Sequence, residues 1–144
     1  NHRDECAISR QLFRGSLAEC AVYGGCSGGD VAMAGMSLVP FAPGGPTAGI
    51  LKTAAGHIRL VSGKSGFASI EAGKAGFNVY TMTHVEGHAA AYMRQNAIDD
   101  AVLIINNPKI CVNCMRNLPH MLPEGARLTV QTPNSSHIFI GNSR

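Results

Sequence analysis

The sequence predicts a three-layer α/β domain, in which a mixed sheet of about five strands carries helices on both faces and the last two strands are antiparallel. Alternating apolar and polar residues at 50–61 and 127–140 are typical of strands. Apolar residues recur at helical spacing through 84–96, and the unbroken apolar run at 101–105 is typical of a strand covered on both faces. Strands and helices that alternate along one chain indicate an α/β architecture.

One ordinary globular domain accounts for most of the chain. Its 144 residues are enough to bury a hydrophobic core, and only 15% of them are charged. No apolar run approaches the ~18 residues that suggest a membrane-spanning helix, so we expect no membrane association. The first residue is Asn1 rather than an initiator methionine, and we expect the chain to be part of a longer protein.

The composition changes near residue 48. Glycine, proline and small residues are frequent over 24–49, where they interrupt the chain too often for long helices or strands. We therefore expect residues 1–48 to be an N-terminal segment that ends in a Gly/Pro-rich linker over 40–49. Residues 49–144 are expected to form the folded domain, and a short helix is predicted at 10–23.

The charge of the chain is unevenly distributed. Residues 1–48 carry three basic against four acidic side chains, a balance of −1, whereas residues 49–144 carry nine against five, a balance of +4. A positive domain is compatible with a polyanionic partner such as nucleic acid, and equally with a solvated basic surface.

The first part of the domain is expected to contain strands and a short connection. Residues 50–61 fit a strand pair around a glycine turn. Residues 66–75 mix small and apolar side chains and fit either a short helix or an irregular connection. Residues 76–82 alternate apolar and polar side chains, which predicts a further strand.

Two helices follow. The first is predicted over 84–96, with Thr83 as an N-cap whose hydroxyl can accept a hydrogen bond from an unpaired amide. The second is predicted over 111–121 and should be interrupted by Pro119, because proline lacks the N–H that a helix interior needs.

The last two strands are predicted at 127–132 and 137–140. The loop between them, P-N-S-S, has room for a turn only. A parallel connection needs a dozen residues or more, so these strands must be antiparallel.

The cysteines fall into two groups. Cys6, Cys20 and Cys26 have irregular spacing, and we expect free thiols buried as small hydrophobic groups. Cys111 and Cys114 form a C-x-x-C pair, which can place two sulfurs on one tetrahedral metal ion if the first cysteine opens a helix. The chain has no second C-x-x-C, so further ligands must be histidine or carboxylate.

His84, His88 and His120 are the candidates for a third ligand. His84 and Glu86 are two residues apart, which on a helix means a rotation of ~200°, but at a helix N-terminus both side chains can project past its end. His84 with Cys111 and Cys114 would then give three protein ligands and an open fourth position, the arrangement of a catalytic Zn²⁺. Glu86 would lie beside that position as the catalytic carboxylate, whereas we expect His88 to be a surface or outer-sphere residue.

These motifs are similar to those of a known enzyme superfamily. H-x-E followed by C-x-x-C, with one strand between two helices, resembles the cytidine-deaminase superfamily. The longer stretches T-H-V-E-G-H-A-A-A-Y-M-R-Q-N, I-I-N-N-P-K-I-C-V-N-C and M-L-P-E-G-A-R-L-T-V are similar to the DddA-like bacterial toxin deaminases, an interbacterial DNA cytosine deaminase family. The likeness covers roughly residues 49–142. In the superfamily a proline usually directly precedes the first cysteine, whereas Pro108 lies three positions before Cys111.

The resemblance implies a cytidine-deaminase-like fold and a zinc-dependent reaction that converts cytosine to uracil in single- or double-stranded DNA, with Glu86 relaying protons. It also implies a monomeric effector that is secreted or delivered into the cytoplasm of a target cell, and a cognate immunity protein. Deamination of RNA or free nucleosides is an alternative. Another is a non-catalytic structural zinc module that uses the two cysteines of the pair, His120 and one further histidine.

Four residues are candidates for substrate contact. Asn106 and Asn107 can hydrogen-bond the base or sugar, or they can simply form the turn before Pro108. Ser62 opens S-G-K-S-G, which fits a phosphate-binding loop or a flexible turn. Tyr80 can stack on a base, whereas core packing is expected for the nearby Phe77.

Overall fold

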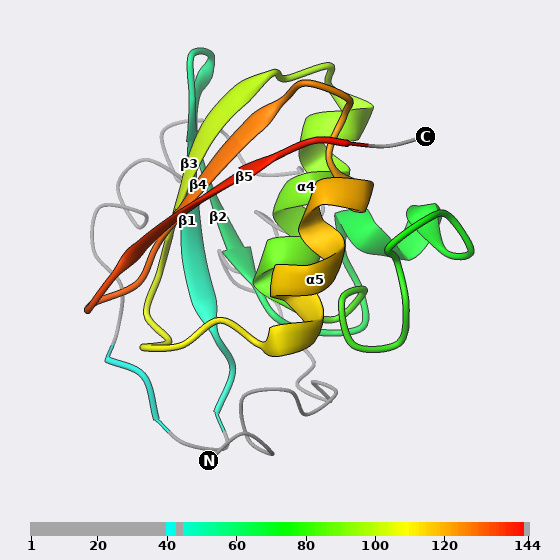
Figure 1. Ribbon diagram of the computed structural model, residues 1–144. Helices are drawn as coiled ribbons and strands as arrows, with labels where there is room; N and C mark the ends of the chain where they lie inside the picture. Colours follow the sequence, from blue (N-terminus) through cyan, green and yellow to red (C-terminus); the bar gives the residue numbers. More distant parts are fainter. Residues whose placement is uncertain (1–39, 43–44, 143–144) are drawn as a thin grey trace.

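The computed structural model describes residues 40–42 and 45–142 (Figure 1). The helix predicted at 10–23 and the cysteines Cys6, Cys20 and Cys26 lie outside these residues. The elements, in chain order, are strands β1 (Ala48–Thr53) and β2 (Gly56–Val61), 3-10 helix η1 (Phe67–Glu71), helix α4 (Val85–Gln95), strand β3 (Asp100–Ile105), helix α5 (Val112–Met121), and strands β4 (Arg127–Gln131) and β5 (Ser136–Ile140).

The five strands form one mixed sheet in the order β2-β1-β3-β4-β5. β3 and β4 are parallel and every other neighbouring pair is antiparallel. The predicted antiparallel arrangement of the last two strands is confirmed, because the turn after Thr132 is too short for a crossover. The predicted strand pair at the start of the domain is also confirmed, with Gly56 at the turn in a left-handed conformation (φ 131°).

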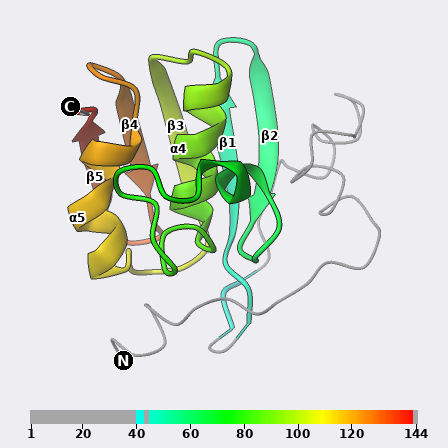
Figure 2. The ribbon, with the colours of Figure 1, turned by 90° about the vertical axis from the view of Figure 1, so that its right-hand side faces the viewer.

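Helices α4 and α5 lie side by side on one face of the sheet, with η1 against α4 (Figure 2). In the part of the chain that the structure describes, the helices lie on this face only, and the predicted helices of the opposite face are not among these residues. None of the described helices is long and apolar enough to cross a membrane.

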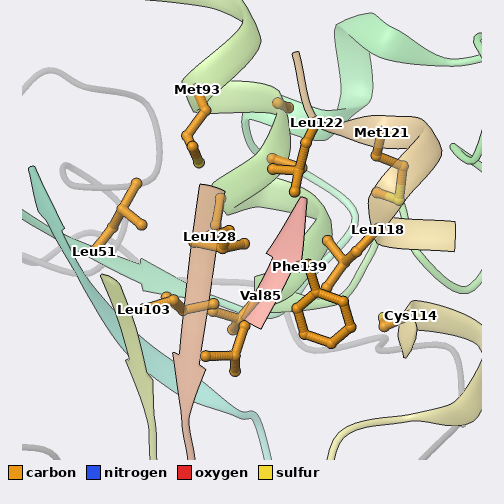
Figure 3. Packing of buried hydrophobic residues seen from close by; sticks show 14 of the residues in the cluster. Leu51, Val85, Met93, Leu103, Cys114, Leu118, Met121, Leu122, Leu128 and Phe139 are labelled. Atoms are coloured by element: carbon orange, nitrogen blue, oxygen red, sulfur yellow. The ribbon is translucent and has the colours of Figure 1, made fainter. Parts of the chain in front are cut away.

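The core lies between the sheet and these two helices (Figure 3). Gly49 allows β1 and the start of α4 to lie close together, because a Cβ at this position would lie only 2.8 Å from a methyl group of Val85. Phe77 is buried in the core as expected. The side chains labelled in Figure 3 come from the strands (Leu51, Leu103, Leu128, Phe139), from α4 (Val85, Met93) and from α5 and its C-cap (Cys114, Leu118, Met121, Leu122).

The prediction of a strand at 76–82 is wrong, because this segment is a series of turns. The Asn78 side-chain oxygen accepts hydrogen bonds from the backbone N–H groups of Tyr80 and Thr81, at 2.9 and 3.0 Å. The Thr81 hydroxyl donates to the carbonyl of Gly76 at 2.6 Å. Asparagine side chains that bond the backbone two residues on favour a turn over a strand.

Two helix details also differ from prediction. His84, not Thr83, is the N-cap of α4, because the Thr83 hydroxyl donates backwards to the carbonyl of Tyr80. Pro119 does not interrupt α5, which continues to Met121. Pro119 lacks only the N–H that would have bonded the carbonyl of Met115, so the helix loses one hydrogen bond and continues for two more residues.

The end of the predicted linker is part of the folded domain. β1 begins at Ala48, and the N–H of Thr47 donates to the hydroxyl of Ser62 at 2.9 Å. The chain is therefore fixed at the sheet shortly before residue 49.

Replacement of Gly87 by Ala is expected to destabilise the domain. Glycine to alanine inside a helix ordinarily stabilises it by about 1 kcal/mol. Here a Cβ would overlap the carbonyl oxygen of Thr81, so the 76–83 turns would have to move away from α4. We expect the unfolding free energy to fall by about 1–3 kcal/mol, measured by urea denaturation. A more stable variant would contradict this packing.

Candidate active site

His84, Cys111 and Cys114 form a buried cluster where α4 and α5 begin. His84 and Cys111 are the N-caps of the two helices, and Cys114 lies in the first turn of α5. Their ligand atoms all lie within 4.8 Å of one another, and Nδ1 of His84 is 3.3 Å from Sγ of Cys114. A tetrahedral zinc ion bound at about 2.0 Å to nitrogen and about 2.3 Å to sulfur holds these atoms about 3.5–3.8 Å apart. The 3.3 Å between His84 and Cys114 is close to that spacing, and atoms as far apart as 4.8 Å would have to move about 1 Å closer around an ion.

The chemistry of Cys114 also fits a cation at this position. Burial, with the nearby carboxylate of Glu86, raises the pKa of the Cys114 thiol well above its usual value. A thiol that coordinates a metal ion loses its proton, because the ion's charge outweighs such effects. These residues suit a metal ion held by one nitrogen and two sulfurs when Cys111, whose sulfur forms a disulfide in this structure, is reduced to a thiol.

Glu86 lies in the first turn of α4 and is 4% exposed. Burial raises the pKa of its carboxyl group, and the nearby His84 opposes this shift. His84 has an extended backbone (φ −88°, ψ 154°), so it precedes the helix proper and the two side chains avoid opposite faces of one helix. A buried carboxyl group with a raised pKa, next to possible metal ligands, is typical of an acid–base catalyst.

His88 is completely buried, whereas its spacing after His84 had favoured a surface or outer-sphere position. Its Nδ1 accepts a hydrogen bond from the N–H of Ala68 at 3.2 Å, so Nε2 carries the proton and donates to the carbonyl of Gly63 at 3.0 Å. Burial lowers the pKa of His88 to about 4, with a smaller contribution from His84. The neutral imidazole thus joins both ends of the 63–68 loop to α4.

The side chains of three predicted substrate contacts make hydrogen bonds within the protein. Asn106 Oδ1 accepts from the N–H of Ala48 at 3.0 Å, and Ser62 accepts from Thr47. Asn107 Oδ1 accepts from the N–H of Lys109 at 3.0 Å, which is an Asx turn. All three are buried, and through bonds to Thr47 and Ala48 they connect the start of β1 to the loops after β2 and β3.

Tyr80 differs from these residues because it is 37% exposed. It lies in the turns at 76–83, which Asn78 connects to α5 by donating to the side chain of Asn113 at 2.8 Å. Tyr80 therefore remains a candidate for contact with a base beside the start of α5.

His120 lies apart from the cluster. It is exposed in the last turn of α5, whereas the two cysteines lie at the helix start. The alternative of a structural zinc module therefore lacks the histidine that it would need.

Replacement of His88 by Leu is expected to loosen the 63–68 loop without removing metal. The change leaves buried Gly63 and Ala68 backbone groups without their partner, which costs about 1–3 kcal/mol of stability. Hydrogen exchange at the amide of Ala68 should accelerate. His120→Leu is the matched control at an exposed site. Loss of metal from the His88 variant alone would identify His88 as a ligand.

The fold and this cluster define a class of protein. A mixed five-stranded sheet, with a histidine and two cysteines gathered at the starts of two adjacent helices, is the arrangement of a cytidine-deaminase-like enzyme. The family model described as SCP1.201-like deaminase matches residues 33–143. The chain belongs to this family and is a hydrolytic deaminase, as the resemblance of its motifs implied.

A curated relative supports this assignment. The chain is 35% identical over 72 residues to Double-stranded DNA deaminase toxin A from Burkholderia cenocepacia (strain H111). The match covers 42% of this chain and 5% of that protein, so the chain spans a small part of the relative's length.

Proposed function

We propose that the chain is a zinc-dependent deaminase that converts cytosine to uracil in DNA. The observation that carries the proposal is the cluster of His84, Cys111 and Cys114, whose ligand atoms lie within 4.8 Å, together with the buried Glu86 two residues after the histidine. Three protein ligands leave a fourth position open, which is the arrangement of a catalytic rather than a structural zinc site.

The reaction replaces the amino group at C4 of cytosine with oxygen from water. A zinc ion held by the three ligands would supply a water with its pKa lowered to about 7, and so a nucleophile at neutral pH. Glu86 would carry the protons, giving one to N3 of the base and one to the leaving amino group, which departs as ammonia. Its burial favours the protonated form that can donate.

DNA is the proposed substrate for two reasons. The curated relative is described as a double-stranded DNA deaminase. Residues 49–144 also carry a balance of +4, nine basic against five acidic side chains, which suits a polyanion. Duplex DNA requires the target base to be flipped out at a cost of a few kcal/mol, whereas single-stranded DNA does not.

We further propose that this chain is the toxin domain of a larger secreted bacterial protein and acts as a monomer in the cytoplasm of a target cell. The relative is described as a toxin, and the chain spans only 5% of its length. A producing cell would then need an immunity protein that covers the active site.

Expression in a bacterium that lacks such an immunity protein tests this role. We expect poor growth and an excess of C-to-T changes in the genome of the surviving cells, since uracil is read as thymine. A strain that expresses Glu86→Ala at the same level is the control. Normal growth with C-to-T changes at the control level would remove the support for a DNA-damaging toxin.

A further inference from the structure

Three asparagine side chains, here called the asparagine ladder, are hydrogen-bonded to one another beside the metal cluster. Asn113 is the second residue of α5 and lies between the two cysteines of the cluster in the sequence. Its Oδ1 accepts from Nδ2 of Asn78 at 2.8 Å and from Nδ2 of Asn117 at 3.0 Å. The ladder therefore joins the turns at 76–83 to the first half of α5.

Hydrogen bonds fix which way the Asn113 amide points. Oδ1 of Asn78 accepts from two backbone N–H groups, those of Tyr80 and Thr81, at 2.9 and 3.0 Å. The NH₂ group of Asn78 must therefore face Asn113. Nδ2 of Asn117 also donates to the backbone carbonyl of Asn113 at 2.7 Å, so its N–H groups face this residue too. A side-chain amide between two N–H donors turns its oxygen toward them, because its own NH₂ group cannot accept a hydrogen bond.

The NH₂ group of Asn113 consequently points away from the ladder. Among the described residues none accepts a hydrogen bond from it. The nitrogen reaches solvent, because Oε1 of Glu71 is the one fully buried side-chain N or O atom of these residues that lacks a hydrogen-bond partner. A donor whose side chain is already fixed loses little conformational freedom when a ligand accepts from it.

The surroundings of this NH₂ group suit a nucleobase. Val112 precedes Asn113 on α5, and Val79 and Tyr80 follow Asn78 in the turns at 76–83. All three of these side chains are exposed. Exposed apolar and aromatic groups can pack on the flat faces of bases, whereas they offer a phosphate neither a hydrogen bond nor a positive charge. A neutral donor between them therefore fits the edge of a base better than the DNA backbone.

We propose that Asn113 recognises a base that flanks the target cytosine by donating a hydrogen bond to a keto oxygen, O4 of thymine or O6 of guanine. This inference rests on the proposed function and assigns a sequence preference to its site. Asn113 adjoins Cys114 in the first turn of α5, so a base that contacts it lies beside the one at the metal.

The asparagine ladder excludes the other bases. An asparagine with both polar groups available pairs with adenine, accepting from its amino group and donating to its ring nitrogen. The oxygen of Asn113 is occupied by the ladder, so this pairing is closed. The amino groups of adenine and cytosine would meet a second donor, whereas a keto oxygen would meet an N–H group.

Asn113→Asp separates the NH₂ group from the ladder. The aspartate keeps an oxygen that can accept from Asn78 and Asn117, but its carboxylate has no hydrogen to donate. A negative charge is favourable in the first turn of a helix, so the melting temperature should not fall. Met115→Asp is the matched control, because it adds the same charge at an exposed position of α5 outside the ladder.

The measurement is a ranking of sequence contexts. DNA with random bases on both sides of a cytosine is incubated with each protein, as duplex and as single strands, and the C-to-T changes are sequenced. At one flanking position, wild-type protein should favour thymine and guanine about 2- to 10-fold, the factor that one hydrogen bond contributes. Asn113→Asp should shift the preference toward adenine and cytosine, since a carboxylate accepts from amino groups. Met115→Asp should keep the wild-type ranking.

Two results would overturn the inference. One is a wild-type ranking that favours keto bases at neither flanking position. The other is an Asn113→Asp protein that reacts more slowly and keeps the wild-type ranking, which is the effect of added charge or lost stability alone. Asn113→Ala gives a second variant, which loses the oxygen and the NH₂ group together. It should have a lower melting temperature and discriminate less among flanking bases, and an unchanged ranking in this variant would also contradict the contact.

Failure of the proposed function gives a different result. If the zinc-loaded wild-type protein converts no cytosine in any nucleic acid, the deaminase proposal falls and the role of Asn113 with it. If cytosine is converted but its ranking does not depend on Asn113, only the contact with the flanking base is wrong.

Discussion

Replacement of Glu86 by Ala is expected to reduce uracil formation by a factor of about 10² to 10⁴, the range that a positioned acid–base catalyst contributes. Glu86 is buried beside His84 in the first turn of α4. The methyl side chain of alanine cannot carry protons to the base. The initial rate of uracil formation on a cytosine-containing oligonucleotide measures the effect.

Metal content and activity together distinguish a proton-carrying Glu86 from a Glu86 that binds zinc and from a Glu86 that takes no part in catalysis. The Glu86→Ala protein should keep its zinc, and its unfolding free energy should not fall, because a buried carboxyl group is removed rather than a ligand. Glu124→Ala, at an exposed position, is the control and should retain full activity. Loss of zinc from the Glu86 variant would make Glu86 a ligand, and retained activity would exclude it from catalysis.

Removal of a proposed ligand is expected to have the second large effect. Cys114→Ser keeps the size of the side chain but replaces a strong zinc ligand with a weak one. We expect this variant to be purified with little zinc and to form no measurable uracil. His84→Ala should behave in the same way, whereas His120→Ala, at the exposed end of α5, should keep both metal and activity.

Zinc should also stabilise the fold. A ligand that binds only the native state at a hundred times its Kd adds about 2.7 kcal/mol to the unfolding free energy. Chelation should therefore lower the melting temperature of the wild-type protein, and added zinc should restore it. The Cys114→Ser protein should respond to neither treatment. Equal melting temperatures of wild-type protein with and without zinc would contradict a metal bound at this cluster.

The fold was predictable in those segments for which the sequence allows only one local structure. The four-residue P-N-S-S loop allows only an antiparallel pair, and the apolar run at 101–105 becomes the central strand of the sheet. The segment 76–82 was not predictable from alternation alone. Its pattern suits a strand, but the side chain of Asn78 bonds the backbone of Tyr80 and Thr81 and stabilises turns instead.

The candidate site was predictable to a similar degree. His84, Cys111 and Cys114 could be grouped because H-x-E and C-x-x-C each lie at the predicted start of a helix. Side chains at the starts of two adjacent helices can reach one point. His88 could not be placed, because its partners are backbone atoms of Gly63 and Ala68, which only tertiary structure brings near it. A signal was present in the apolar and small residues around His88, which indicate a buried face of α4, and a buried histidine must find partners.

The most direct test of the central claim is uracil formation by the purified, zinc-loaded chain on matched cytosine-containing duplex DNA, single-stranded DNA and RNA. Free cytidine and the Glu86→Ala protein serve as controls. We predict that at least one form of DNA acquires uracil, and that neither chelated wild-type protein nor the Glu86 variant produces it. Deamination of RNA or cytidine without either form of DNA would contradict the proposed substrate, and absence of uracil from every substrate would contradict the proposed cytosine chemistry.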